Sequence, residues 1–269
     1  MERELNIGLL NQHNMSYYHH LIKSAVVPAY GALTTAWIAA TSETDTTIIS
    51  ALNTLETDGT ANGWLSKMRI MYPIVGGTAT KHKYNFINTA TYQLTYASGM
   101  THSSSGMAGN GSTGYADTGF ANSITAQNSI SAGVYIKGVL GNGLFGSIGG
   151  SSRTYLYGVG NQIYITANND TNAIVSSALG FWGVTRTSST TRTAVSKTTT
   201  FTDTNRVSAT PSTYNQYINA INVSGSASGH STINANIAFA FHGDGLTIAQ
   251  LESMRTDVQT FQTSLGRQV

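Results

Sequence analysis

The feature that most constrains this chain is a long series of short runs in which apolar and polar residues alternate. Alternation places every second side chain on one face of a strand, so each run predicts a β-strand. The runs recur at intervals of roughly 8–15 residues, which is typical of a sandwich or barrel. The expected strands are Tyr92–Ala97, Ile130–Lys137, Leu144–Ile148, Tyr155–Tyr157, Gln162–Thr166, Phe181–Thr185, Thr193–Lys197, Tyr217–Val223 and Asn236–Phe241.

The residues between these runs are the ones that tight turns require. Gly109-Asn110-Gly111 and Gly141-Asn142-Gly143 are examples, and both residue types tolerate the positive φ of hairpin turns. No crossover helix is expected between the runs, so neighbouring strands should be antiparallel. The pattern therefore predicts a mainly β, antiparallel β-sandwich, preceded by a helical or extended segment and followed by a C-terminal helix.

Two stretches outside the β region predict helices. Residues 42–72 read as a helical pair, which begins at Ser42-Glu43-Thr44-Asp45, a capping box with Asp in place of Glu. Its apolar residues at helical spacing are Ile48, Ile49, Leu52 and Leu55, then Trp64, Leu65, Met68 and Met71.

The second helix is expected over residues 246–265, where Thr247 and Gln250 can form a capping box and Gly266 suits a left-handed C-terminal cap. Its apolar side chains form one narrow stripe: Leu251, Met254, Val258, Phe261 and Leu265. Two interpretations stay open, of which the first is favoured: the stripe packs on the sandwich of the same chain, or it lies at an oligomer axis.

These patterns divide the chain into three parts: an anchoring segment over residues 1–41, a helical linker over 42–83 and the sandwich with its C-terminal helix over 84–269. The apolar stretch Ala25–Ala40 is interrupted by Pro28 and Gly31, so no membrane insertion is expected. The start, Met1-Glu2-Arg3-Glu4, does not resemble a secretory signal.

Charged side chains are scarce, at 10 % of all residues, and this limits the chemistry available. Retaining glycoside hydrolysis needs two carboxyl groups about 5–5.5 Å apart. There is no Glu between Glu56 and Glu252, and the Asp residues of the β region, Asn85–Gly245, are isolated in sequence: Asp117, Asp170, Asp203 and Asp244. We therefore expect no catalytic residues and no enzymatic activity.

Metal and nucleic-acid sites also lack support in the sequence. The chain has no Cys, and none of its 7 His residues falls in a metal-binding motif. Asn168-Asn169-Asp170 and Asp117-Thr118 are weak candidates for calcium, because hard cations prefer several oxygen ligands. A net charge of +2 without a basic stripe argues against nucleic-acid binding. No cofactor is expected.

Aromatic side chains, in a sequence rich in amides and hydroxyls, are the groups that remain for binding a ligand. Flat aromatic faces can stack on the apolar face of a sugar ring. The candidate glycan-binding residues are Tyr155, Tyr157, Tyr164, Trp182, Tyr214 and Tyr217. Trp182 lies in the apolar run Leu179–Val184, so a core position is favoured for it, whereas Tyr155 and Tyr157 are two apart and must share a face.

Three stretches resemble a family of tailed-bacteriophage virion proteins. They are residues 64–85, including Tyr72-Pro73-Ile74-Val75-Gly76-Gly77; residues 101–106; and residues 243–267, from Gly243-Asp244-Gly245 to Leu265-Gly266-Arg267. The resemblance implies a concanavalin A-like, or laminin-G-like, jelly roll on a tail or head fibre.

The resemblance also implies partners and a location. The N-terminal segment would dock on other virion proteins, the chain would form a homo-oligomer, with a trimer favoured, and the sandwich would be displayed outside after assembly in the host cytoplasm. Three functions remain open at this point: attachment to a host surface glycan, a capsid or tail decoration without a ligand, and an extracellular carbohydrate-binding lectin.

Overall fold

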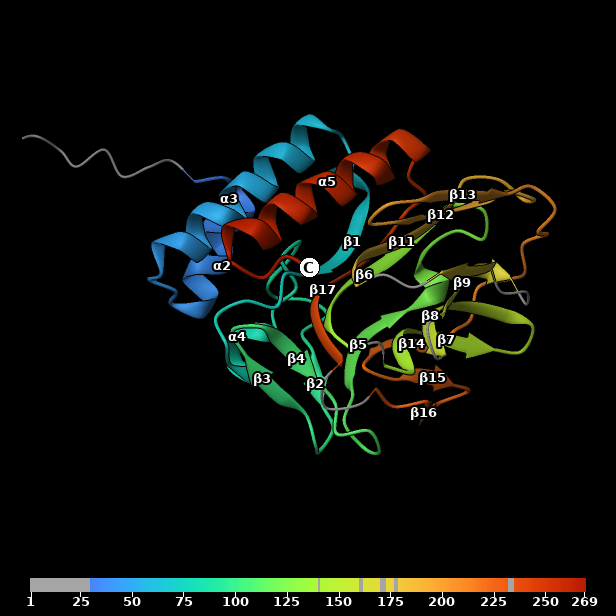
Figure 1. Ribbon diagram of the computed structural model, residues 1–269, viewed down its shortest axis with the longest axis horizontal. Helices are drawn as coiled ribbons and strands as arrows, with labels where there is room; N and C mark the ends of the chain where they lie inside the picture. Colours follow the sequence, from blue (N-terminus) through green and yellow to red (C-terminus); the bar gives the residue numbers. More distant parts are fainter. Residues whose placement is uncertain (1–29, 140, 160–161, 170–172, 177–178, 232–234) are drawn as a thin grey trace, which may run out of the picture.

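The computed structural model describes residues 30–269, apart from 140, 160–161, 170–172, 177–178 and 232–234. Two large β-sheets face one another, and a layer of helices covers the outside of one of them (Figure 1). The mainly β, antiparallel sandwich with a C-terminal helix is thereby confirmed. The anchoring role expected of residues 1–41 falls largely on residues 1–29, which lie outside the described part.

The first sheet, called sheet A, has eight strands built around the adjacent long strands β6 and β17. Strands β1 and β4 both pair antiparallel with β17 on the side away from β6, and β1 pairs with the later residues of β17. In spatial order the strands are β13 (Thr200–Asp203), β12 (Arg192–Ser196), β11 (Gly180–Arg186), β6 (Ile130–Gly138), β17 (Ala235–Gly243), β4 (Gly106–Ala108) and β3 (Thr101–Ser103), with β1 (Met68–Tyr72) beside β17.

The second sheet, called sheet B, has nine strands. In spatial order they are β10 (Ala173–Ser176), β9 (Gln162–Asn169), β8 (Ser152–Val159), β7 (Gly143–Gly149), β14 (Asn215–Ile218), β5 (Ala116–Ala121) and β2 (Thr95–Tyr96). The hairpin of β15 (Ile221–Val223) and β16 (Ser226–Ser228) joins β7 by a short parallel ladder, an exception to the antiparallel rule. The predicted strand Tyr217–Val223 is thus two strands, separated at Asn219, whose φ is +64°.

The core between the sheets is mainly apolar, as the alternation predicts, although Arg186 and Asn168 are also fully buried. One cluster of buried residues takes side chains from both sheets, including Val134 and Val184 of sheet A and Leu156 and Ile165 of sheet B. Trp182 belongs to this cluster and is 1 % exposed, so it is a core residue and does not face a ligand.

The outer face of sheet A is covered by α3 (Thr46–Ala61) and α5 (Ile248–Ser264), which lie side by side, with α2 (Ala32–Thr41) beyond α3 (Figure 1). A second buried cluster joins these helices to Tyr135, Phe181 and Phe241 of the sheet. Four members of the α5 stripe lie in this cluster, so the stripe packs within the chain instead of facing an oligomer axis: Leu251, Met254, Val258 and Phe261.

Local capping explains where the helices begin. The Thr247 and Gln250 side chains form the predicted capping box of α5, and Gly266 has the expected left-handed φ of +63°. The N-cap of α3 is Asp45, whose carboxylate accepts from Thr47 N and Ile48 N, whereas the predicted cap Ser42 ends α2 in a left-handed conformation. Asp45 alone therefore caps α3, and the predicted capping box over Ser42–Asp45 does not form, because the Asp45 carboxylate reaches both amides by itself.

The segment expected as a helical linker contributes to the sandwich. It contains α3, a 3-10 turn at Leu65–Lys67, strand β1 and the short helix α4 (Ala79–His82). Residues 68–72 form strand β1 and not the predicted helix. Both faces of this strand are buried. Ile70 and Tyr72 face the core between the sheets, and Met68 and Met71 face the helices. Burial on both faces removes the period-two signal.

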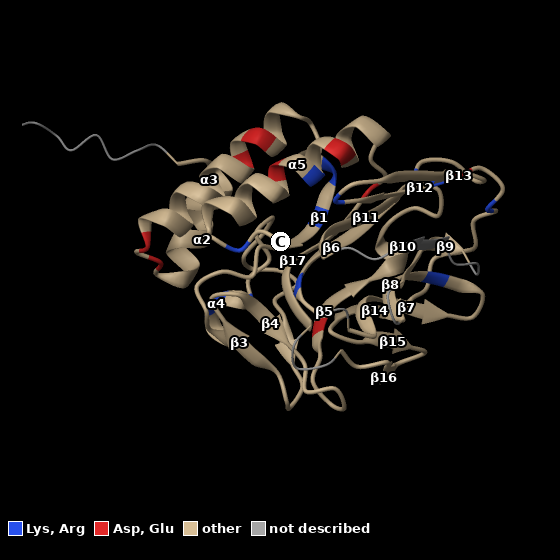
Figure 2. Ribbon diagram, viewed as in Figure 1, with Lys and Arg blue, Asp and Glu red and all other residues tan. Residues whose placement is uncertain are grey.

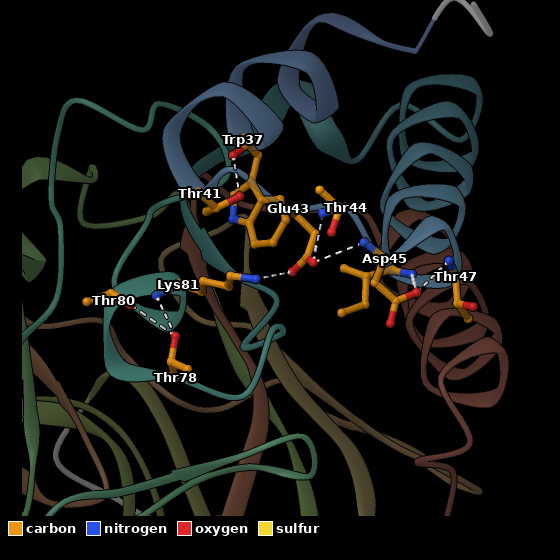
Figure 3. A network of polar contacts seen from close by, with 10 residues as sticks. Trp37, Thr41, Glu43, Thr44, Asp45, Thr47, Thr78, Thr80 and Lys81 are labelled. Carbon is orange, nitrogen blue, oxygen red and sulfur yellow. Dashed lines mark hydrogen bonds and ion pairs between the residues drawn. The ribbon is translucent and has the colours of Figure 1, made fainter.

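An ion pair ties the connection between α2 and α3 to the short helix α4. Lys81 Nζ lies 3.0 Å from Glu43 Oε2, and the Thr44 and Asp45 amides donate to the other carboxylate oxygen (Figure 3). Burial by itself raises the pKa of Glu43, but these donors outweigh it and the net pKa is lowered. No helix within the described ranges is both long and apolar enough to cross a membrane.

Candidate functional site

A pocket on the outer face of sheet B brings together two of the predicted tyrosines. We call it the tyrosine pocket, and its volume is about 200 Å³. It lies between strand β8 and the β15–β16 hairpin and is lined by Ile148, Tyr155, Tyr157, Ile221, Val223, Ser228 and Gly229.

The alternation of β8 fixes the direction of both tyrosines. Leu156 is fully buried in the core between the sheets, so Tyr155 and Tyr157 point to the outer face. Their ring centroids are 6.4 Å apart with an interplanar angle of 80°, which makes a corner of two perpendicular rings. Tyr155 is 7 % exposed and Tyr157 is half-buried.

The hairpin supplies the opposite wall. Val223 pairs with Ile148 across the parallel ladder, which places both beside Tyr155 and Tyr157. Gly229 follows the hairpin and has a left-handed φ of +60°. A Cβ at this position would lie 2.6 Å from the Tyr157 ring, so the close approach of the hairpin to that ring requires glycine.

A row of outward-facing residues extends the site across sheet B. Tyr155 is opposite Gly146, Gly146 is opposite Tyr217, and Tyr217 is opposite Asp117. Tyr217 is 7 % exposed, and burial together with Asp117 raises its pKa to about 12. Tyr115 stacks on Tyr217, with ring centroids 4.5 Å apart and an interplanar angle of 22°.

Two further predicted aromatic residues, Tyr164 and Tyr214, do not line the pocket. Tyr164 is opposite Tyr157 on β9 and its hydroxyl contacts Gln162 at 3.4 Å. Tyr214 precedes β14 and packs against Gly149 and Gly225. Both are half-buried, and neither lines the tyrosine pocket.

The sequence pattern did not identify the rest of the site. Tyr115 and His230 have ring centroids 6.0 Å apart beside Tyr217, yet Tyr115 follows a Gly-rich turn and shows no strand signal. Ile221 and Val223 reach the pocket only because β15 pairs with β7. The one signal that could have found them is the short alternation after Asn219.

The described Asp residues of the β region each have a structural partner. Asp117 accepts from Gly119 N at 2.8 Å, Asp203 pairs with Arg206 at 2.5 Å and Arg192 at 3.5 Å, and Asp244 pairs with Arg69 at 2.8 Å. They lie in different parts of the fold: Asp117 is in β5 of sheet B, Asp203 is in β13 at the edge of sheet A, and Asp244 directly follows β17. Acidic residues are sparse in both sheets (Figure 2). Asp170 is outside the described residues.

The two calcium candidates have other roles where they are described. Asn168 is fully buried, and its Oδ1 accepts hydrogen bonds from Asn122 and Thr154 inside the sandwich. The Asp117 carboxylate makes a turn contact to Gly119 and contacts Asn215 at 3.4 Å. Among the residues with a described position, no group of three or more His, Cys, Asp and Glu could hold a metal ion.

A second pocket, of about 390 Å³, lies where the α2–α3 connection meets the loop after β1 and the end of the chain. Its charged groups serve the fold: Glu43 pairs with Lys81 (Figure 3), and Arg267 donates to the backbone carbonyls of Ile74, Pro73, Ser104 and Ala238. This pocket is larger than the tyrosine pocket, but its polar groups are already engaged.

Comparison with known proteins gives distant similarities to solved structures. No protein-family model matches the sequence, and no curated protein matches it. Domain 4 of AbnA, a GH43 extracellular arabinanase from Geobacillus stearothermophilus solved with arabinotriose, is 12 % identical with a TM-score of 0.43, covering 70 % of this chain and 98 % of that one. The Trypanosoma rangeli sialidase in complex with 2,3-difluoro-KDN is 9 % identical with a TM-score of 0.37, covering 80 % of this chain and 39 % of that one. At these values the similarity carries no argument about function.

Proposed function

We propose that this protein is a non-enzymatic glycan-binding β-sandwich, and that it serves as an appendage of a tailed-bacteriophage virion for attachment to a host surface. The observation that carries the proposal is the perpendicular corner of Tyr155 and Tyr157, 6.4 Å between centroids, facing an open pocket. Concave sites with aromatic walls and few polar groups are typical of small-ligand binding.

The corner suits a sugar for a physical reason. The C–H groups on one side of a pyranose ring form an apolar patch, which packs on an aromatic face, while its hydroxyls stay hydrated or reach nearby polar groups. Tyr157 offers such a face, and the Ser228 hydroxyl lies in the same pocket. Tyrosine adds contact area at low conformational cost, because only two side-chain torsions are fixed.

The engagement of the acidic side chains supports binding without catalysis. A retaining or inverting glycosidase needs one carboxyl group kept as an acid and a second carboxylate facing it. Asp117, Asp203 and Asp244 each contact an amide or an arginine instead, and neither an Asp nor a Glu from the described ranges lines the tyrosine pocket.

The virion assignment is supported by the three stretches that resemble such proteins. They meet at one side chain in the fold: Arg267, in the last stretch, donates to Ile74 O in the first at 2.8 Å and to Ser104 O in the second at 3.4 Å. Segments that are distant in sequence thus meet at one junction in the fold.

The test is a glycan array probed with the full chain and with Tyr157→Ala. We expect saturable binding to a subset of glycans, lost in the variant, because half of the corner is removed. Tyr84→Ala is the matched control, since Tyr84 is also half-buried but packs against the helical layer. Binding that survives Tyr157→Ala would reject this site, and an array without any binding would reject the function.

A purely structural decoration protein is the second candidate. It is favoured by the small exposed area of Tyr155 and Tyr217, each 7 % exposed. In that case Tyr157→Ala would leave incorporation into particles and adsorption to host cells unchanged, whereas the attachment role requires that adsorption falls.

A further inference from the structure

The tyrosine pocket is apolar to an unusual degree for a sugar site. Five of its seven lining residues are aliphatic or tyrosine: Ile148, Tyr155, Tyr157, Ile221 and Val223. The others are Ser228 and Gly229, and none of the described lining residues is charged. A fully hydroxylated sugar face would bury hydroxyls against aliphatic carbons, which costs free energy when no partner is present.

The volume of the pocket limits how much of a ligand can enter. Sites for drug-sized ligands commonly occupy about 300–1,000 Å³, whereas this pocket has about 200 Å³. It therefore takes one ring or one substituent of a longer chain. The rest of such a chain would lie outside the pocket.

We propose that the tyrosine pocket selects a neutral sugar that carries a methyl group, as 6-deoxyhexoses and N-acetylhexosamines do. The methyl group would lie against Ile148, Ile221 and Val223, and the ring would pack on the tyrosine corner. This inference rests on the proposed glycan-binding function and adds the chemical class of the ligand.

The first experiment compares sugars that differ only at the methyl group. Methyl α-L-rhamnoside is compared with methyl α-L-mannoside, L-fucose with L-galactose, and N-acetylglucosamine with N-formylglucosamine, each titrated into the full chain by NMR. We expect the methyl-bearing member of at least one pair to bind about tenfold or more tightly, the usual effect of one apolar group in an apolar pocket. Saturation transfer should be strongest at its methyl protons.

The second experiment changes the wall of the pocket. Val223→Thr keeps the shape and adds a hydroxyl, so we expect it to reduce the preference for the methyl-bearing sugar severalfold. Val223 is 36 % exposed, and the substitution can be tolerated by the fold. Val159→Thr is the matched control, because Val159 is 48 % exposed on the same strand as the tyrosines but does not line the pocket.

The outcomes separate the two proposals. An array without any bound glycan would reject the proposed function and this inference together. Bound glycans without a methyl-bearing sugar, or equal affinity within all three pairs, would overturn the inference and leave the function standing. A preference for acidic sugars would also overturn it, and would implicate Arg153, which precedes the tyrosines on the same face of β8.

Discussion

The indole Nε1 of Trp64 donates a hydrogen bond of 2.7 Å to Oδ2 of Asp257. Trp64 is fully buried and Asp257 is 8 % exposed, so the contact is made away from solvent. The same oxygen accepts from Asn62 Nδ2 at 2.8 Å. This carboxylate therefore joins the end of α3 to the middle of α5.

Removing that carboxylate should destabilise the helical layer. We expect Asp257→Ala to lower the free energy of unfolding by about 2–4 kcal/mol, because the buried indole N–H loses its partner. Asp257→Asn keeps one acceptor oxygen and should lose less. Urea unfolding followed by tryptophan fluorescence measures both, and equal stability of the Ala variant and the parent would contradict the expected role.

Gly146 should not tolerate a side chain. Its φ is +140°, and a Cβ would lie 2.3 Å from the Thr154 carbonyl and 2.4 Å from Tyr155 Cα. We expect Gly146→Ala to cost about 3 kcal/mol or more, from backbone strain and overlap together. Gly150→Ala is the control, because its φ is +58° but nothing lies within 4 Å, so the loss should be only about 1–2 kcal/mol. Similar unfolding midpoints for both variants would disprove the steric explanation.

Acid should destabilise the protein through two buried histidines. Burial lowers the pKa of His242, and likewise that of His82, to about 3 from 6.5. The unfolded state then binds more protons between these values, so stability falls as pH drops from 6.5 towards 3, by up to about 1.4 kcal/mol per pH unit for each histidine. Unfolding midpoints at pH 7 and pH 5 should differ accordingly.

The variant for this pH dependence is His242→Gln, which keeps a polar group near Thr125 Oγ1, 3.4 Å from His242 Nε2. It should remove only part of the loss between pH 7 and pH 5, because burial also lowers the pKa of His82 and of His102. A pH dependence unchanged in this variant would show that His242 is not one of the responsible groups.

Arg267 should be sensitive even to a conservative change. Its guanidinium donates to four backbone carbonyls and to Gln262 Oε1. A lysine ammonium keeps the positive charge but cannot donate to all of these acceptors as the planar guanidinium does. We therefore expect Arg267→Lys to lower the free energy of unfolding by about 3 kcal/mol or more. Arg255→Lys, at a half-buried arginine of α5, should cost less than about 1 kcal/mol by the same denaturation assay. A loss for Arg267→Lys as small as that for Arg255→Lys would mean that the charge alone matters.

The sequence predicts those elements whose start or orientation depends only on neighbouring residues. The capping box of α5 and the alternation of β8 need only neighbouring residues, and both the helix start and the shared face of Tyr155 and Tyr157 follow from them. Strand β1 was misread as helical because Met68 and Met71 have helical spacing, while its true partner β17 lies far along the chain.

The candidate site was predictable only in part for the same reason. The tyrosine corner lies on one strand, but its opposite wall depends on the parallel pairing of Val223 with Ile148. The apolar run around Trp182 favours a core position, and Trp182 is buried in the core. Asp257 gave no signal, since its partner Trp64 is distant in sequence.

The pairing of β1 with β17 has a consequence for folding during synthesis. β17 lies between β6 and β1 in sheet A, yet it is translated after every other described strand. Until it leaves the ribosome, β6 and β1 are open edges on which a nascent chain can aggregate. Sheet A can therefore close only after translation is nearly finished, and we expect folding to be slow, as for other topologies dominated by non-local pairing.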